Sequence, residues 1–114
     1  MPYVKIQTNI TIAPDVQRTL LATVSRQVAD ALNKPERYVM VEANGDAPLV
    51  FGGSDDPAAY VELKSIGLAD TQTQQLSQIV CTMLKEELGI DPARTYIEFI
   101  AIPRAFWGWN GSTF

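Results

Sequence analysis

The chain has 114 residues, of which 46% are hydrophobic, and its 13 acidic and 9 basic residues give a net charge of −4. We expect this length to form one domain, residues 1–114, with its own hydrophobic core. Histidine is absent and Cys81 is the only cysteine, which excludes Ser-His-Asp and Cys-His catalysis, the usual zinc sites and an internal disulfide. The acidic balance provides no basic patch for a nucleic acid.

The sequence also argues against a membrane protein. No apolar run approaches the roughly 20 residues that span a bilayer. The N-terminus lacks the basic flank and apolar stretch of a secretory signal. We therefore expect a cytoplasmic protein with no membrane partner, no nucleic-acid partner and no metal.

The first half of the chain predicts a strand, a helix and a strand. Tyr3–Ile10 alternates apolar and polar residues, which is typical of a strand with one buried face. Pro14–Leu32 begins with a proline and an aspartate and repeats apolar residues at helical spacing. Asn33–Pro35 ends this helix, and Tyr38–Ala43 is predicted to be the second strand.

The second half repeats this order. Ala58–Ile66 is predicted to be a strand, Thr71–Leu88 a helix that Gly89 closes, and Thr95–Ile102 a strand. At an offset of half the chain, Pro35 and Arg37 align with Pro92 and Arg94. The sequence is thus interpreted as two pseudo-repeats, about 1–57 and 58–114.

Two such units predict an α/β (α+β) fold. Each strand-helix-strand crossover should be right-handed with parallel strands, which gives a four-stranded mixed sheet with both helices on one face. The other face would be uncovered, and we expect its apolar side chains to be covered by self-association, sheet against sheet. Leu49–Phe51 and the aromatic tail could reach neighbouring subunits, although the tail could equally pack within its own chain as a hairpin. The tail comprises Phe106, Trp107, Trp109 and Phe114.

Pro2 is the candidate catalytic residue. It follows Met1, and removal of a start methionine is favoured before a small residue, which would leave a free secondary amine on Pro2. A terminal amine titrates near ~7.7 to 8.0, and an apolar pocket lowers its pKa toward that of a neutral base at physiological pH. The alternative is that Met-Pro merely starts a strand. If Met1 is retained, the Pro2 nitrogen is an amide and cannot act as a base.

Several short motifs in one order along the whole chain resemble the macrophage migration inhibitory factor and D-dopachrome tautomerase family of the tautomerase superfamily. They are Pro2, Lys34-Pro35, Tyr38, Phe51-Gly52-Gly53-Ser54, Ser65-Ile66-Gly67, Tyr96-Ile97, Gly108-Trp109-Asn110 and Ser112-Thr113-Phe114. The resemblance implies a homotrimer in which extra short strands pair between subunits, with active sites at the subunit boundaries. It also implies cofactor-independent keto-enol tautomerisation of phenylpyruvate-like 2-oxo acids.

The resemblance also implies roles for individual residues. Pro2 would be the acid-base group, Lys34 would bind the substrate carboxylate or carbonyl oxygen, and the Ile66 amide would donate a hydrogen bond. Tyr96 of the adjoining subunit would polarise the substrate, and the apolar walls would come from Tyr38, Trp109 and Phe114. Without the resemblance, Lys34 would be interpreted as a solvated charge at a helix end and the tyrosines as strand packing.

Two residues depart from the family pattern. Glu98 stands where the mammalian cytokine has a substrate-binding asparagine, and its carboxylate should repel a carboxylate substrate unless Arg104 or Arg37 pairs with it. Trp107 replaces a smaller aliphatic residue at the pocket mouth and should narrow it. We therefore expect weak or altered phenylpyruvate activity.

Two other functions remain open on the sequence. One is a cytokine-like protein that binds a receptor and is exported without a signal peptide, as the family is. The other is a trimeric scaffold whose pocket is vestigial, which retention of Met1 would favour.

Overall fold

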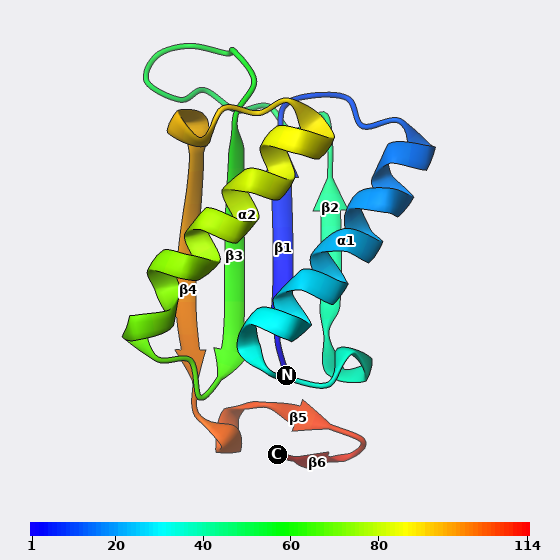
Figure 1. The fold of residues 1–114 in the computed structure, drawn as a ribbon, viewed down its shortest axis with the longest axis vertical. Coiled ribbons are helices and arrows are strands. Elements are labelled where there is room, and N and C mark those ends of the chain that lie inside the picture. Colours follow the sequence, from blue (N-terminus) through cyan, green and yellow to red (C-terminus); the bar gives the residue numbers. More distant parts are fainter.

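The computed structural model of the chain describes residues 1–114 as two layers, a four-stranded sheet and two helices that cover one of its faces (Figure 1). A two-stranded hairpin follows at the C-terminus. In chain order the elements are β1 (Tyr3–Thr8), α1 (Pro14–Leu32), β2 (Met40–Asn44), β3 (Ala59–Ile66), α2 (Thr73–Leu88), β4 (Thr95–Ile102), β5 (Gly108–Trp109) and β6 (Ser112–Thr113).

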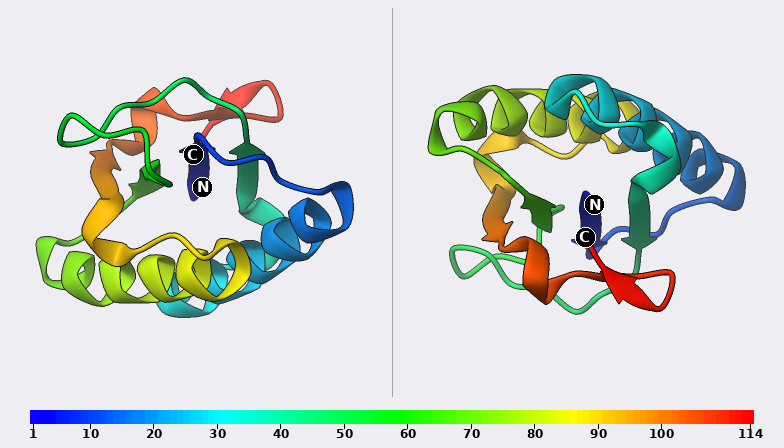
Figure 2. Two further views of the ribbon diagram at one scale, coloured as in Figure 1. Left: turned by 90° about the horizontal axis from the view of Figure 1, so that it is seen from above. Right: turned by 90° about the horizontal axis from the view of Figure 1, so that it is seen from below.

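The sheet has the strand order β2-β1-β3-β4, which confirms the predicted mixed sheet and the duplicated strand-helix-strand unit. β1 pairs in parallel with β2, and β3 pairs in parallel with β4. The two units are joined by antiparallel pairing of β1 with β3, in which Tyr3 stands opposite Lys64. Both helices lie on the same side, and the hairpin lies on the other side near both chain ends (Figure 2).

Three element boundaries differ by two residues from the sequence prediction. β2 begins at Met40 rather than Tyr38, because Glu36–Tyr38 forms a 3₁₀ turn in which the Tyr38 N–H donates to the Pro35 carbonyl at 3.1 Å. α2 begins two residues late, since a 3₁₀ turn precedes it. β1 ends at Thr8, whose buried hydroxyl donates to the Ala58 carbonyl at 2.7 Å.

The core lies between the helices and the sheet face that they cover. Both helices present an apolar stripe at spacings of three and four residues, and neither is both long and apolar enough to cross a membrane. Fully buried side chains come from both layers and include Val4, Ile6, Val61 and Leu63 of the sheet, Leu20, Val24 and Val28 of α1, and Leu76, Val80 and Leu84 of α2.

The open sheet face is charged in its middle and apolar only toward its edge strands, so the expectation of an apolar face was correct only in part. Alternate residues of the strands place a charged row across its middle, in which Lys5 pairs in register with Glu42 and Glu62, and Glu62 with Glu98. The Tyr3 hydroxyl also donates to Glu42 on this face. Large exposed hydrophobic side chains lie instead at the margins of the sheet and in the loops, namely Met40, Val50, Tyr96, Phe106 and Trp109. Association through the edges and ends of the sheet therefore fits this surface better than stacking of faces.

Arg94 fixes the long loop between β2 and β3. Its guanidinium donates to four loop carbonyls at 3.0 to 3.1 Å, and it lies 5.2 Å from the centroid of the Phe51 ring. The planar fork of arginine suits several carbonyls at once, whereas lysine supplies a single point charge. The carbonyls belong to Phe51, Ser54, Asp56 and Pro57.

We predict that Arg94→Lys loosens residues 51–57 without unfolding the sheet. Loss of several charge-assisted hydrogen bonds should raise amide hydrogen exchange in this loop by about tenfold or more. Hydrogen-deuterium exchange measured by mass spectrometry checks this, with the exposed Arg26→Lys on α1 as the control. Equal exchange in the two variants would contradict a fixing role for Arg94.

Candidate active site

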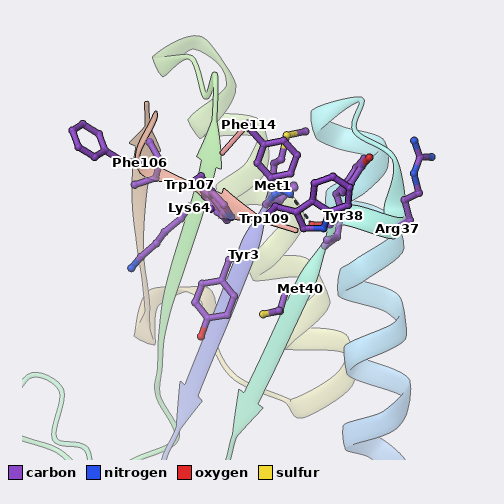
Figure 3. A pocket seen from close by; sticks show the side chains of 14 residues that line it. Met1, Tyr3, Arg37, Tyr38, Met40, Lys64, Phe106, Trp107, Trp109 and Phe114 are labelled. Atoms are coloured by element: carbon purple, nitrogen blue, oxygen red, sulfur yellow. Dashed lines mark hydrogen bonds between the residues drawn. The ribbon is translucent and has the colours of Figure 1, made fainter. Parts of the chain in front are cut away.

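A pocket with a volume of about 700 Å³ lies at the end of the sheet where β1 begins. Figure 3 shows that it is formed by the first residues of the chain, the turn before β2 and the C-terminal hairpin. These segments are far apart in the sequence, and the sheet brings them together. The lining consists of Met1–Tyr3, Arg37–Met40, Lys64, Ile102, Phe106–Trp109 and Phe114.

Three aromatic side chains form one wall of the pocket. Trp109 and Phe114 stack with centroids 5.4 Å apart and an interplanar angle of 14°, and both meet the edge of Tyr38 at 5.4 and 5.7 Å. Asn110 and Gly111 turn the hairpin in left-handed conformations, which places Trp109 beside Phe114. For these two residues the intramolecular alternative is correct, whereas the Phe106 side chain remains 80% exposed.

The N-terminus is tied to the turn before β2. The Met1 amine donates to the Tyr38 carbonyl at 2.7 Å, and the Met40 N–H donates to the Pro2 carbonyl at 3.0 Å. Pro2 itself is buried. Desolvation of the Met1 amine, and next the positive charge of Lys34, lower its pKa below the ordinary value. This end of the pocket therefore favours a neutral terminal amine.

Lys34 is positioned by the end of α1. Asn33 takes a left-handed conformation at the helix C-terminus, and the Lys34 N–H donates back to the Ala29 carbonyl at 2.9 Å. Pro35 follows and prevents continuation of the helix. The half-buried Lys34 side chain does not line the pocket, but its charge acts on the terminal amine inside it.

The pocket gathers five of the nine residues that the sequence nominated: Pro2, Tyr38, Trp107, Trp109 and Phe114. Ile66 is buried outside the lining, but it pairs in register with Ile102, which is part of the lining.

Tyr96 and Glu98 lie away from this pocket, toward the other end of β4. Tyr96 pairs with Tyr60, its side chain is 65% exposed, and its ring centroid is 4.6 Å from that of Phe51. A second hollow of about 330 Å³ surrounds it, formed by Leu49–Gly52 and Ala58–Tyr60. Within one chain, Tyr96 therefore cannot meet a ligand bound next to Pro2.

Neither of the arginines that could have neutralised Glu98, Arg104 and Arg37, forms an ion pair with it within this chain. Glu98 acts instead on the neighbouring strand, where desolvation and then its carboxylate raise the pKa of Tyr60. The carboxylate thus lies on the open face, beside a hydroxyl group.

The sequence interpretation missed Lys64 and overlooked Arg37 as a pocket residue. Lys64 reaches the pocket because β3 runs antiparallel to β1, and no local pattern signals that register. The Arg37 guanidinium lies 4.8 Å from the centroid of the Tyr38 ring. A basic residue next to a nominated aromatic one was the only available signal for it.

Comparison with known proteins agrees with this architecture. The sequence model described as "Macrophage migration inhibitory factor (MIF)" matches residues 1–114. The chain belongs to the macrophage migration inhibitory factor family. It is 42% identical to the macrophage migration inhibitory factor homolog of Brugia malayi over 115 residues, covering 100% of this chain and 99% of that one. The mouse macrophage migration inhibitory factor is 36% identical over the same coverage.

Solved structures extend the likeness to three dimensions. The crystal structure of a macrophage migration inhibitory factor homologue from Prochlorococcus marinus superposes with a TM-score of 0.94 at 42% identity, covering 98% of each chain. The macrophage migration inhibitory factor of Trichinella spiralis gives a TM-score of 0.92 at 39% identity, covering 98% of this chain and 99% of that one. The family lies within the tautomerase superfamily, so the isomerase class is the plausible one for this pocket.

Proposed function

We propose that the protein is a cofactor-independent keto-enol tautomerase of phenylpyruvate-like 2-oxo acids, with the amine of Pro2 as its acid-base group once Met1 is removed. The observation that carries the proposal is the buried position of Pro2 in an aromatic pocket, where the pKa of the adjacent terminal amine is already lowered. Loss of Met1 would move the free amine onto Pro2, one residue deeper in the pocket.

The reaction requires one proton to move between carbon and oxygen. The neutral Pro2 nitrogen would take a proton from the carbon next to the carbonyl, and the C–H electron pair would form the new C=C bond. The carbonyl π pair would move to oxygen, which then accepts a proton from the Pro2 ammonium to give the enol. Lys34, and a backbone N–H at Ile66, would stabilise the negative charge that develops on oxygen.

The aromatic wall suits the other end of such a substrate. Tyr38, Trp109 and Phe114 offer edges and faces to a phenyl ring, and offset or edge-on ring contacts add to the gain from burial. Trp107 also lines the pocket and would narrow it. We propose that it alters activity relative to a family member with a smaller residue there.

We propose a homotrimer in which the margin of each sheet contacts the margin of the sheet in the next subunit. Met40 on the edge strand β2 and Tyr96 on the edge strand β4 are 67% and 65% exposed, as is Val50, at 71%, in the loop beside Tyr96. Contact between such margins would bury these side chains and bring Tyr96 and Glu98 of one subunit to the Pro2 pocket of the next. Glu98 would then weaken binding of a carboxylate substrate.

The alternative function is a secreted, cytokine-like protein whose pocket is part of a receptor-binding surface. The similarity of the chain to the macrophage migration inhibitory factors of mouse and rat supports this alternative. Receptor binding that survives loss of Pro2 activity would support this alternative over the enzyme.

We predict that Pro2→Gly lowers phenylenolpyruvate ketonisation by about 10²- to 10⁴-fold, the range for loss of an acid-base group. The rate should be followed by absorbance, with intact mass proving that Met1 is removed from both proteins and circular dichroism proving that both are folded. Equal, near-background rates in the two proteins would contradict the enzyme assignment.

We predict that Lys34→Gln moves the acidic limb of the kcat/KM profile to higher pH. The base acts when neutral, and the charge of Lys34 lowers the pKa of the terminal amine, so removal of that charge raises this pKa. The exposed Lys85→Gln on α2 carries the same charge change and serves as the control. If the acidic limb of the kcat/KM profile stayed at the same pH while activity fell, the prediction would be contradicted, and Lys34 would act on the substrate alone.

We predict that Pro2→Gly and Tyr96→Ala complement each other. If each site combines Pro2 of one subunit with Tyr96 of the next, trimers refolded from a mixture will contain some intact sites. The mixture should therefore be more active than either variant refolded alone, with the concentration of total chains held constant. Activity equal to the mean of the two variants would contradict a shared site.

A further inference from the structure

The pocket is positively charged in a protein that is negatively charged overall. Within one chain its lining includes Arg37 and Lys64 and contains no aspartate or glutamate, whereas the whole chain has a net charge of −4. The trimer proposed above would set one carboxylate, Glu98 of a neighbouring subunit, against these cations. Lys34 adds a third positive charge, which reaches the terminal amine from outside the lining. The basic character is therefore concentrated where a ligand would bind.

A monoanionic substrate leaves part of this charge unused. In the proposed function, Lys34 suffices for the single carboxylate and the developing oxyanion of a phenylpyruvate-like acid. Figure 3 shows Lys64 and Arg37 on opposite sides of the pocket, with the aromatic residues Tyr38, Trp109 and Phe114 between them. The aromatic wall therefore lies between two cationic side chains.

Lys64 is the more available of the two cations. Its Nζ lies 4.0 Å from Oε2 of Glu62, which exceeds hydrogen-bond length, and its side chain is 37% exposed. An ion pair of this kind contributes little and is readily exchanged for a better-placed anion. The Arg37 guanidinium, in contrast, already stacks on the Tyr38 ring.

The register of the sheet places Lys64 close to the N-terminal residues, which carry the proposed acid-base group. Lys64 stands opposite Tyr3 in the β1–β3 pair, so its backbone is a direct cross-strand neighbour of the residue after Pro2. It projects from the open face, as do Tyr3 and Met40, which line the same pocket. Because Lys64 and Pro2 line the same pocket, one ligand could place an anionic group at Lys64 and a carbonyl group beside Pro2.

We propose that Lys64 determines specificity by selecting aromatic 2-oxo acids that carry a second anionic group on the ring, either a carboxylate or a phosphate. This inference rests on the proposed function and names the substrate class of the same site. Lys64 binds the ring substituent, Lys34 binds the 2-oxo acid end, and the aromatic wall holds the ring between them.

The test compares substrates that differ only in the charge of one ring substituent. 4-Carboxyphenylpyruvate and 4-phosphonophenylpyruvate supply the anion, the phosphonate standing in for a phosphate, and 4-carbamoylphenylpyruvate is the neutral isostere of the first. In the parent protein without Met1, kcat/KM should favour the anionic substrates, mainly through KM, and the preference should fall with added salt. Whichever of the two anionic substrates has the larger kcat/KM relative to the neutral one identifies carboxylate or phosphate as the better group.

Lys64→Gln should lower the ratio of kcat/KM for the 4-carboxy and 4-carbamoyl substrates by about tenfold, because a charge-assisted hydrogen bond is lost. Lys85→Gln, which removes one charge from an exposed helix position, should leave that ratio as in the parent. An unchanged ratio in Lys64→Gln would overturn the proposal. The proposal would also be overturned if this ratio of kcat/KM values fell in Arg37→Gln and not in Lys64→Gln.

Binding separates failure of this inference from failure of the proposed function. If the parent turns over none of these acids, the tautomerase proposal fails, and quenching of Trp107 and Trp109 fluorescence still reports on the pocket. Benzene-1,4-dicarboxylate should then bind the parent more tightly than 4-carbamoylbenzoate, and Lys64→Gln should remove the difference. Equal affinities in the parent would overturn the role of Lys64.

Discussion

The central position of β1 is the constraint on which the candidate site depends. This strand is flanked by β2 and β3, so its first residues enter the sheet between two neighbours and cannot extend freely into solvent. Hydrogen bonds from the terminal amine to the Tyr38 carbonyl and from the Met40 N–H to the Pro2 carbonyl fix them there. A terminal amine, normally solvated, is thereby partly desolvated and held near Lys34, and both effects lower its pKa.

The same sheet distributes the family's site residues over its two ends. Pro2, Tyr38 and the hairpin residues meet at the end where β1 begins, while Tyr96 lies with Phe51 near the start of β4. Arg94 holds the loop that carries Phe51, so it supports the second end without contacting the first. The open face between the ends is charged and its margins are apolar, which favours contact through margins when copies associate.

Local patterns predicted most of the fold. The alternation in β1 and the apolar stripes of α1 and α2 were strong because each reflects one buried face, and the order of elements then limited the topology. The beginnings of β2 and α2 were misplaced because short 3₁₀ turns precede both, and such turns carry no periodic signal. The polarity of the open face was visible in Lys5 and Gln7 but was outweighed by the expectation that an uncovered face is apolar.

The site was less predictable, for a physical reason. Pro2 was found from its position after Met1, whereas Tyr38, Trp107, Trp109 and Phe114 were found through the resemblance. Lys64 became a pocket residue only through the antiparallel register between the two halves, which depends on tertiary pairing and not on any local pattern. The neighbours of Glu98 on the sheet, Glu62 and Tyr60, likewise follow from strand register, which the sequence alone did not supply.

The most direct test of the account is the pKa of the Pro2 amine in the protein from which Met1 has been removed. Titration of protein labelled with ¹⁵N-proline, followed by NMR, measures it without reference to any substrate. The account predicts a pKa below the ordinary range of terminal amines, about 7.7 to 8.0, and a higher value in Lys34→Gln. A pKa within or above that range in the parent would contradict the claim that the pocket prepares this amine to act as a base.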